Sequence, residues 1–114
     1  MQPAELARAA VDLLADHQAE DVVLLDISRI ASFADYFVIA SATSVRQMQA
    51  LIDVLDRDLG RLGVHHLRRE GTPASGWVLL DYGPVIVHLF AQEQREFYDI
   101  ERLWKDATPV VRIH

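Results

Sequence analysis

The chain has 114 residues, of which 51% are hydrophobic and 25% are charged, and its formal net charge is −6 at pH 7. This composition predicts one globular domain spanning residues 1–114, and the absence of Cys excludes disulfides, thiolate metal sites and a cysteine nucleophile. The acidic balance argues against binding nucleic acid mainly through phosphates and suits a basic protein partner.

No targeting or membrane segment is evident in the sequence. There is no apolar run of the roughly 18 residues that a membrane span needs. The start, Met1–Glu5, lacks the basic region and apolar core of a signal peptide, and it is not Arg-rich like a transit peptide. We therefore expect a cytoplasmic protein that does not bind membranes.

The first half of the chain alternates helical and extended patterns. The predicted elements are a helix from Pro3 to about His17, strands over Asp21–Ile27 and Tyr36–Ala40, a long helix from Val45 to Gly60 or Gly63, and a polar edge strand over His65–Arg69. Ser41–Ser44 is expected to break the second strand, with Thr43 or Ser44 as the N-cap of the long helix.

A β-hairpin is predicted from Trp77 to Phe90, because two apolar runs flank the turn residues Gly83 and Pro84. With these two residues at the centre of the turn, Trp77 opposes Phe90 and Leu80 opposes Val87. One face of the hairpin is an ordinary core face, made of Val78, Leu80, Tyr82, Val85, Val87 and Leu89. The other face mixes aromatic, acidic and imidazole groups and carries Trp77, Leu79, Asp81, Ile86, His88 and Phe90.

The sequence after the hairpin predicts a helix, or a broken pair of turns, from about Gln92 to Lys105. Pro109 stops it, and Val110–Ile113 is expected to lie extended on the body of the protein. The element order is then α-β-β-α-β-β-β-α. This order favours a mixed α/β fold with a five-stranded mixed sheet flanked by helices.

Motifs for catalysis and for metal binding are weak. Asp56 and Asp58 have the spacing that nucleotidyltransferases use for metal ions, but they lie within a helix, where residues two apart do not share a face. Ser41–Ser44 lacks the glycines and the lysine of a phosphate-binding loop. His88 and Asp81 are neighbours without a Ser or Cys nucleophile. We therefore expect no catalytic residue, metal site or cofactor.

A protein-binding surface is the better interpretation of the second hairpin face. Tryptophan, tyrosine and arginine are enriched in binding hot spots. Arg95 and Tyr98 lie one helical turn apart, directly after the hairpin. The predicted partner-binding residues are Trp77, Asp81, His88, Phe90, Arg95 and Tyr98.

The motifs around these residues resemble the Iojap family of ribosomal silencing factors, from about Asp26 to Ala107. They are Asp35-Tyr36-Phe37-Val38-Ile39-Ala40-Ser41, Ser44 with Arg46-Gln47, Glu70-Gly71, Trp77, Leu80-Asp81-Tyr82-Gly83, Val87-His88, Phe90, Arg95, Tyr98, Leu103 and Trp104. One departure is Ala42, where the family typically has Gly.

The resemblance implies a nucleotidyltransferase-like fold without catalytic acids, and a protein that is not an enzyme. It implies binding to the fourteenth protein of the large ribosomal subunit, which blocks joining of the small subunit and represses translation when nutrients are scarce. Some relatives pair as homodimers when free. A nucleotide-binding protein of the same fold and a homodimeric interaction module stay open as alternatives.

Overall fold

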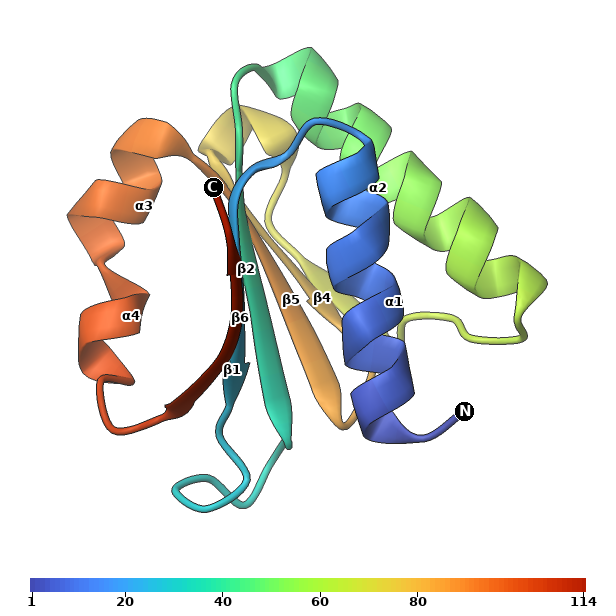
Figure 1. The fold of residues 1–114 in the computed structure, drawn as a ribbon. Coiled ribbons are helices and arrows are strands. Elements are labelled where there is room, and N and C mark those ends of the chain that lie inside the picture. The colour runs from blue at the N-terminus through green and yellow to red at the C-terminus, as the bar shows by residue number, and fades with distance from the viewer.

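A six-stranded mixed sheet forms the centre of the protein, with strand order β3-β4-β5-β2-β1-β6. The computed structural model describes residues 1–114 (Figure 1). The strands are β1 (Glu20–Asp26), β2 (Tyr36–Ala42), β3 (Arg68–Glu70), β4 (Trp77–Asp81), β5 (Val85–Ala91) and β6 (Thr108–Ile113). The helices are α1 (Pro3–Asp16), α2 (Val45–Arg61), the short 3-10 helix η1 (Pro73–Ser75), α3 (Gln92–Tyr98) and α4 (Ile100–Leu103). None of these helices combines the length and apolar character that crossing a membrane requires.

The mixed α/β architecture predicted from the sequence is confirmed, but the strand count of five is wrong. Thr108–Ile113 forms β6, an edge strand that pairs antiparallel with β1. β2 and β5 are parallel, and the other neighbouring pairs are antiparallel. β2 also extends beyond its predicted end, because Ser41 and Ala42 continue the parallel pairing with β5.

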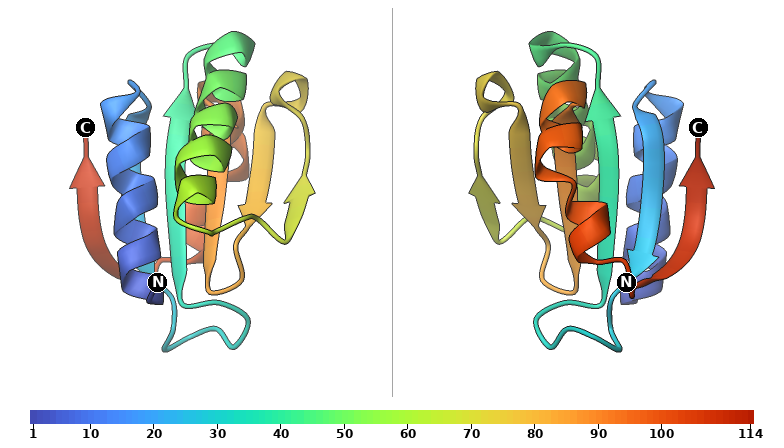
Figure 2. Two further views of the ribbon diagram at one scale, coloured as in Figure 1. Left: turned by 90° about the vertical axis from the view of Figure 1, so that its right-hand side faces the viewer. Right: turned by 90° about the vertical axis from the view of Figure 1, so that its left-hand side faces the viewer.

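Helices cover the two faces of the sheet differently (Figure 2). α1 and α2 pack on one face over the larger core, into which the predicted core face of the hairpin points. On the opposite face α3 and α4 cross the middle of the sheet, and β3 and β4 lie to one side without a helix over them. This second face has a smaller core that includes Phe37, Ile86 and Phe90.

Local hydrogen bonds and backbone angles explain where the helices begin and end. Of the two predicted N-cap residues, Ser44 is the one that caps α2, since its Oγ accepts the backbone N–H of Gln47 at 2.9 Å. The segment after β5 breaks at Asp99, whose φ of 46° is left-handed, so the predicted broken pair of turns becomes α3 and α4. The break lets α4 follow the sheet toward β6 (Figure 1).

Candidate partner-binding surface

The hairpin has the strand pairing that the turn residues predict. Trp77 is paired with Phe90, Leu79 with His88, and Asp81 with Ile86. Opposed residues of an antiparallel pair share a face, so these side chains all project toward the side that carries α3 and α4. The predicted grouping of Trp77, His88 and Phe90 on one face is therefore confirmed.

Trp77 is the centre of an aromatic stack on this face. Its ring stacks on Phe90 with ring centroids 4.9 Å apart, and it contacts the ring of Tyr98 of α3 with centroids 4.6 Å apart. Its indole Nε1 donates a hydrogen bond to Nδ1 of His88 at 3.2 Å. Trp77 is half-buried and Tyr98 is 45% exposed, so the outer part of the stack is open to solvent.

Phe90, His88 and Arg95 lie beneath the surface. Their exposed fractions are 0%, 4% and 7%. A partner that approaches this face meets Trp77 and Tyr98 and does not reach these three side chains. Three of the six predicted partner-binding residues therefore lie beneath the surface, and Trp77, Asp81 and Tyr98 are the three that reach it.

His88 is enclosed by aromatic rings. The Phe37 ring meets it edge-on with ring centroids 4.7 Å apart, and the Phe90 ring is nearly parallel to it with centroids 6.2 Å apart. Burial lowers the pKa of His88 to about 4, because the apolar surroundings disfavour its charged form. The imidazole is therefore neutral near pH 7.

Asp81 does not form an acid–base pair with His88. One oxygen of its carboxylate accepts the backbone N–H of Gly83 at 2.8 Å, which stabilises the hairpin turn. The other lies 3.6 Å from the guanidinium of Arg68 on the neighbouring strand. Asp81 is half-buried, so its carboxylate stays accessible at the edge of the open area.

Arg95 joins α3 to the sheet through a buried network. Its Nη1 donates to the backbone oxygen of Asp21 at 2.7 Å and to Oγ of Ser41 at 2.9 Å. Its Nε donates to Glu101 of α4 at 2.8 Å, and Arg112 of β6 binds the Asp21 carboxylate from the solvent side at 2.8 Å. The carboxylate pKa of Asp21 is lowered although burial opposes this, because the Arg112 hydrogen bond and the charge of Arg95 favour the ionised form. Arg95 thus holds the helix that carries Tyr98.

The uncovered side of the sheet forms an open surface beside this stack, which we call the β4 face. It comprises Arg68, Glu70, Trp77, Leu79, Asp81 and Tyr98. The edge strand β3 completes it, since Glu70 is paired with Leu79 and Arg68 with Asp81. A hollow of about 260 Å³ is lined by Glu70, Gly71, Trp77 and Leu79. The sequence prediction missed Arg68, Glu70 and Leu79, although the period-two pattern of β4 already placed Leu79 on this side.

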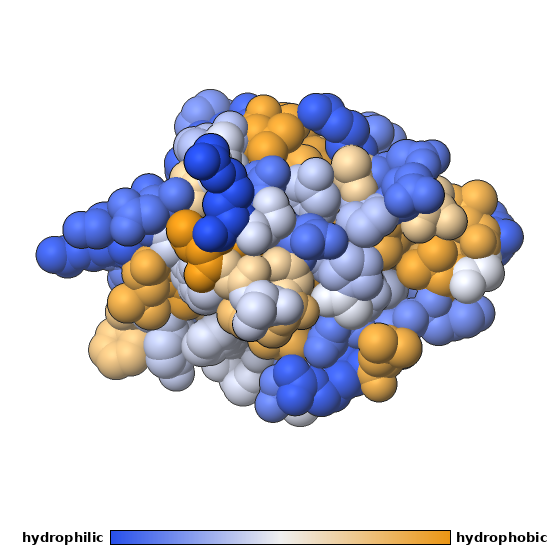
Figure 3. All heavy atoms as spheres, turned by 90° about the horizontal axis from the view of Figure 1, so that it is seen from below, coloured by the Kyte–Doolittle hydropathy of each residue, from blue (hydrophilic) through white to orange (hydrophobic).

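Exposed apolar side chains occur elsewhere on the protein as well. Figure 3 shows the protein from below, and separate apolar patches on this side are divided by hydrophilic side chains. The exposed large apolar residues include Ile30, Phe33, Leu62, Leu67, Phe97 and Leu103. Single exposed apolar residues are normal, so exposure alone does not identify a binding surface. The β4 face differs because Trp77 combines its aromatic contacts with a hydrogen bond to His88 and also lines a hollow.

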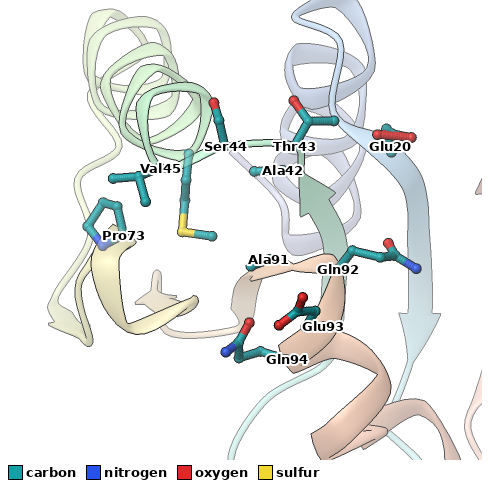
Figure 4. Close-up of a pocket in the computed structure, with 11 residues that line it drawn as sticks. Glu20, Ala42, Thr43, Ser44, Val45, Pro73, Ala91, Gln92, Glu93 and Gln94 are labelled. Atoms are coloured by element: carbon teal, nitrogen blue, oxygen red, sulfur yellow. The ribbon is translucent and has the colours of Figure 1, made fainter.

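A second hollow, of about 500 Å³, lies where β2 and β5 end and α2 and α3 begin (Figure 4). Thr43 and Ser44 line it from one side, and Gln92, Glu93 and Gln94 from the other. Its charged lining residues are Glu20 and Glu93, and no Lys or Arg is among them. Two carboxylates without a cation disfavour a phosphate group at this position.

Asp56 and Asp58 lie within α2, as the sequence predicts, and pair with neighbouring side chains. Asp58 binds Arg57 at 2.8 Å and lies 3.5 Å from Arg61, and Asp56 binds His66 at 3.0 Å. No group of three or more His, Cys, Asp or Glu residues is arranged to hold a metal ion.

Comparison with known proteins gives one consistent family. The family model described as "Ribosomal silencing factor during starvation" matches residues 1–114. Ribosomal silencing factor RsfS of Halalkalibacterium halodurans is 38% identical over 110 residues, which cover 96% of this chain and 94% of that protein. The mouse protein called mitochondrial assembly of ribosomal large subunit protein 1 is 33% identical over 97 residues, covering 82% of this chain and 42% of the relative. The crystal structure of protein CV0518 from Chromobacterium violaceum superposes with a TM-score of 0.87 at 34% identity, covering 92% of this chain and 88% of that chain.

Proposed function

Because this chain belongs to the ribosomal silencing factor family, we propose that it binds the large ribosomal subunit and prevents the small subunit from joining. The family is one of ribosome-associated regulators of translation, and its description includes starvation. The observation that carries the proposal is the family match over the whole of residues 1–114. The protein would then act as a repressor of translation, chiefly when nutrients are limited.

The proposed target is a basic ribosomal protein, the fourteenth of the large subunit, on the side that receives the small subunit. A net charge of −6 supports a protein target over ribosomal RNA as the main contact, because complementary charge speeds encounter. The mouse relative is named for assembly of the ribosomal large subunit, which agrees with that subunit as the partner.

The proposed mechanism is steric exclusion. It needs a docking face and enough bulk to stand in the path of the second subunit. The protein has principal extents of 34 × 34 × 25 Å, so once docked it would occupy space that the small subunit needs in order to join. No reaction is needed, and we propose that the protein is not an enzyme and works in the cytoplasm. We also propose that its fold is related to that of nucleotidyltransferases, used here without their chemistry.

We propose the β4 face as the docking face. Trp77 and Tyr98 are its aromatic anchors, of the residue types enriched in hot spots, and Asp81 supplies an accessible carboxylate to a basic partner. Phe90, His88 and Arg95 contribute from beneath by supporting the anchors. In the free protein the same exposed rings would be available for homodimer formation.

Sedimentation with purified, separated ribosomal subunits tests the proposal. We expect the protein to travel with the large subunit and to stay in the supernatant with the small one. Loading the large subunit first should then reduce recovery of joined ribosomes. If the protein stays in the supernatant at micromolar concentration, the proposal fails. Calorimetry with nucleotide and magnesium, and the oligomeric state in solution, would then test the two alternative functions.

A further inference from the structure

We propose that His88 is a positioning residue for partner binding: its Nδ1 accepts the indole N–H of Trp77 and fixes the half-buried ring in its docking orientation. This inference rests on the proposed function, in which Trp77 contacts the partner. It assigns to His88 a role that does not require His88 to touch the partner.

The strand pairing brings the two rings together. Trp77 and His88 are diagonal neighbours on β4 and β5, because Trp77 is paired with Phe90 and His88 with Leu79. Diagonal neighbours on one face are within reach of aromatic side chains. The ring centroids are 6.0 Å apart, and the distance from Trp77 Nε1 to His88 Nδ1 is 3.2 Å.

This hydrogen bond decides the tautomer of His88. An indole N–H can only donate, so Nδ1 must be the unprotonated nitrogen and Nε2 must carry the hydrogen. Nε2 is buried and has no hydrogen-bond partner. An unpaired buried donor costs stability, and an apolar side chain at this position would avoid that cost. What the imidazole supplies here, and Leu or Phe would not, is an acceptor for Trp77.

The result is a half-buried aromatic side chain that is restrained on several sides. Phe90 stacks on one side of the Trp77 ring, Tyr98 contacts it, and His88 binds its nitrogen. A ring that is already immobile loses less conformational entropy when a partner binds. Removing the acceptor should therefore weaken binding about three- to tenfold, without removing any atom that contacts the partner.

Three variants test this role. His88→Leu keeps a similar volume and removes the acceptor. His88→Asn keeps an acceptor near the Nδ1 position. Trp77→Phe keeps an aromatic ring and removes the donor. We expect His88→Leu to weaken binding to the large subunit three- to tenfold and His88→Asn to weaken it less.

A double-mutant cycle shows whether His88 acts through Trp77. We expect His88→Leu to have little further effect in the Trp77→Phe background, since the hydrogen bond is already absent. Equal losses in both backgrounds, or wild-type binding by a folded His88→Leu protein, would overturn the proposal.

Nitrogen NMR of the wild-type protein tests the same contact without a ribosome. We expect His88 to show an unprotonated Nδ1 and a protonated Nε2, and the indole hydrogen of Trp77 to exchange slowly with water. A protonated Nδ1 would overturn the positioning role even if the protein binds the subunit. If the NMR result holds and no subunit binding is found, the proposed function fails while the contact itself stands. Should His88→Leu not fold, His88→Asn and the wild-type tautomer still decide the outcome.

Discussion

Replacing Trp77 with Ala removes the ring at the centre of the β4 face. Truncating a central aromatic anchor typically costs about 2 kcal/mol or more of binding free energy, which corresponds to roughly a 30-fold rise in Kd. The same change removes the stack on Phe90 at 4.9 Å and the hydrogen bond to His88. Truncating a fully buried Trp costs about 3–5 kcal/mol of stability. Since Trp77 is half-buried, we expect a loss of about 2 kcal/mol.

Binding and folding must therefore be measured separately. A labelled protein can be titrated with large subunits at a temperature well below its Tm, with the melting curve recorded by circular dichroism. Phe33→Ala is the matched control, because Phe33 is a 57% exposed aromatic residue whose ring lies against Phe37 and Trp104 and not against Trp77 or Tyr98. We expect this control to bind within twofold of wild type. A folded Trp77→Ala protein with unchanged Kd, or an equal loss in the Phe33 control, would refute the assignment.

Three predictions concern stability. Gly71→Ala should lower Tm strongly, because φ is +82° and a Cβ would overlap the backbone oxygen of Trp77. Gly63→Ala, with φ of +80° and open space around it, should lower the free energy of unfolding by only about 1 kcal/mol. Equal losses for the two variants in chemical denaturation would contradict this. Arg95→Met should cost about 3–5 kcal/mol, because it leaves buried acceptors unpaired, and the exposed Arg112→Ala should cost under about 1 kcal/mol. Burial lowers the pKa of His88 from 6.5 to about 4, so the unfolded chain binds more protons between these values. Stability should be full above pH 6.5 and fall toward pH 4 by on the order of 3 kcal/mol, and His88→Leu should flatten this slope in urea titrations; an unchanged slope would show that other groups cause it.

The hairpin was predictable because its signals are local. Gly83 and Pro84 fix the turn, and the turn fixes which residues oppose one another. Alternation along each strand then separates the two faces. A local signal likewise limited the cap of α2 to Thr43 or Ser44, and in the structure the Ser44 side chain accepts from a nitrogen only three residues away.

Contacts between distant parts of the chain were not predictable in this way. β6 pairs with β1, so that Ile113 lies opposite Val22, and it is mostly exposed. Pro109 reads as a stop signal, although an edge strand tolerates proline. No local pattern could therefore distinguish this strand from an extended tail.

The candidate site shows the same limit. The alternation of β4 and β5 correctly grouped Trp77, His88 and Phe90, but it cannot say where a helix crosses the sheet. α3 and α4 cover the middle strands and leave β4 open, so Phe90 is buried and Trp77 is half-exposed. Arg95 likewise faces Asp21 and Ser41, which lie far away in sequence and carry no signal for this pairing.

An order-of-addition experiment shows directly whether the bound protein prevents the two subunits from joining. Large subunits are first mixed with wild-type protein or with the Trp77→Ala variant, small subunits are added, and joining is followed by light scattering. We expect wild-type protein to suppress the rise in scattering and the variant to do so only at much higher concentration. A full rise while sedimentation shows the wild-type protein bound to the large subunit would contradict steric exclusion.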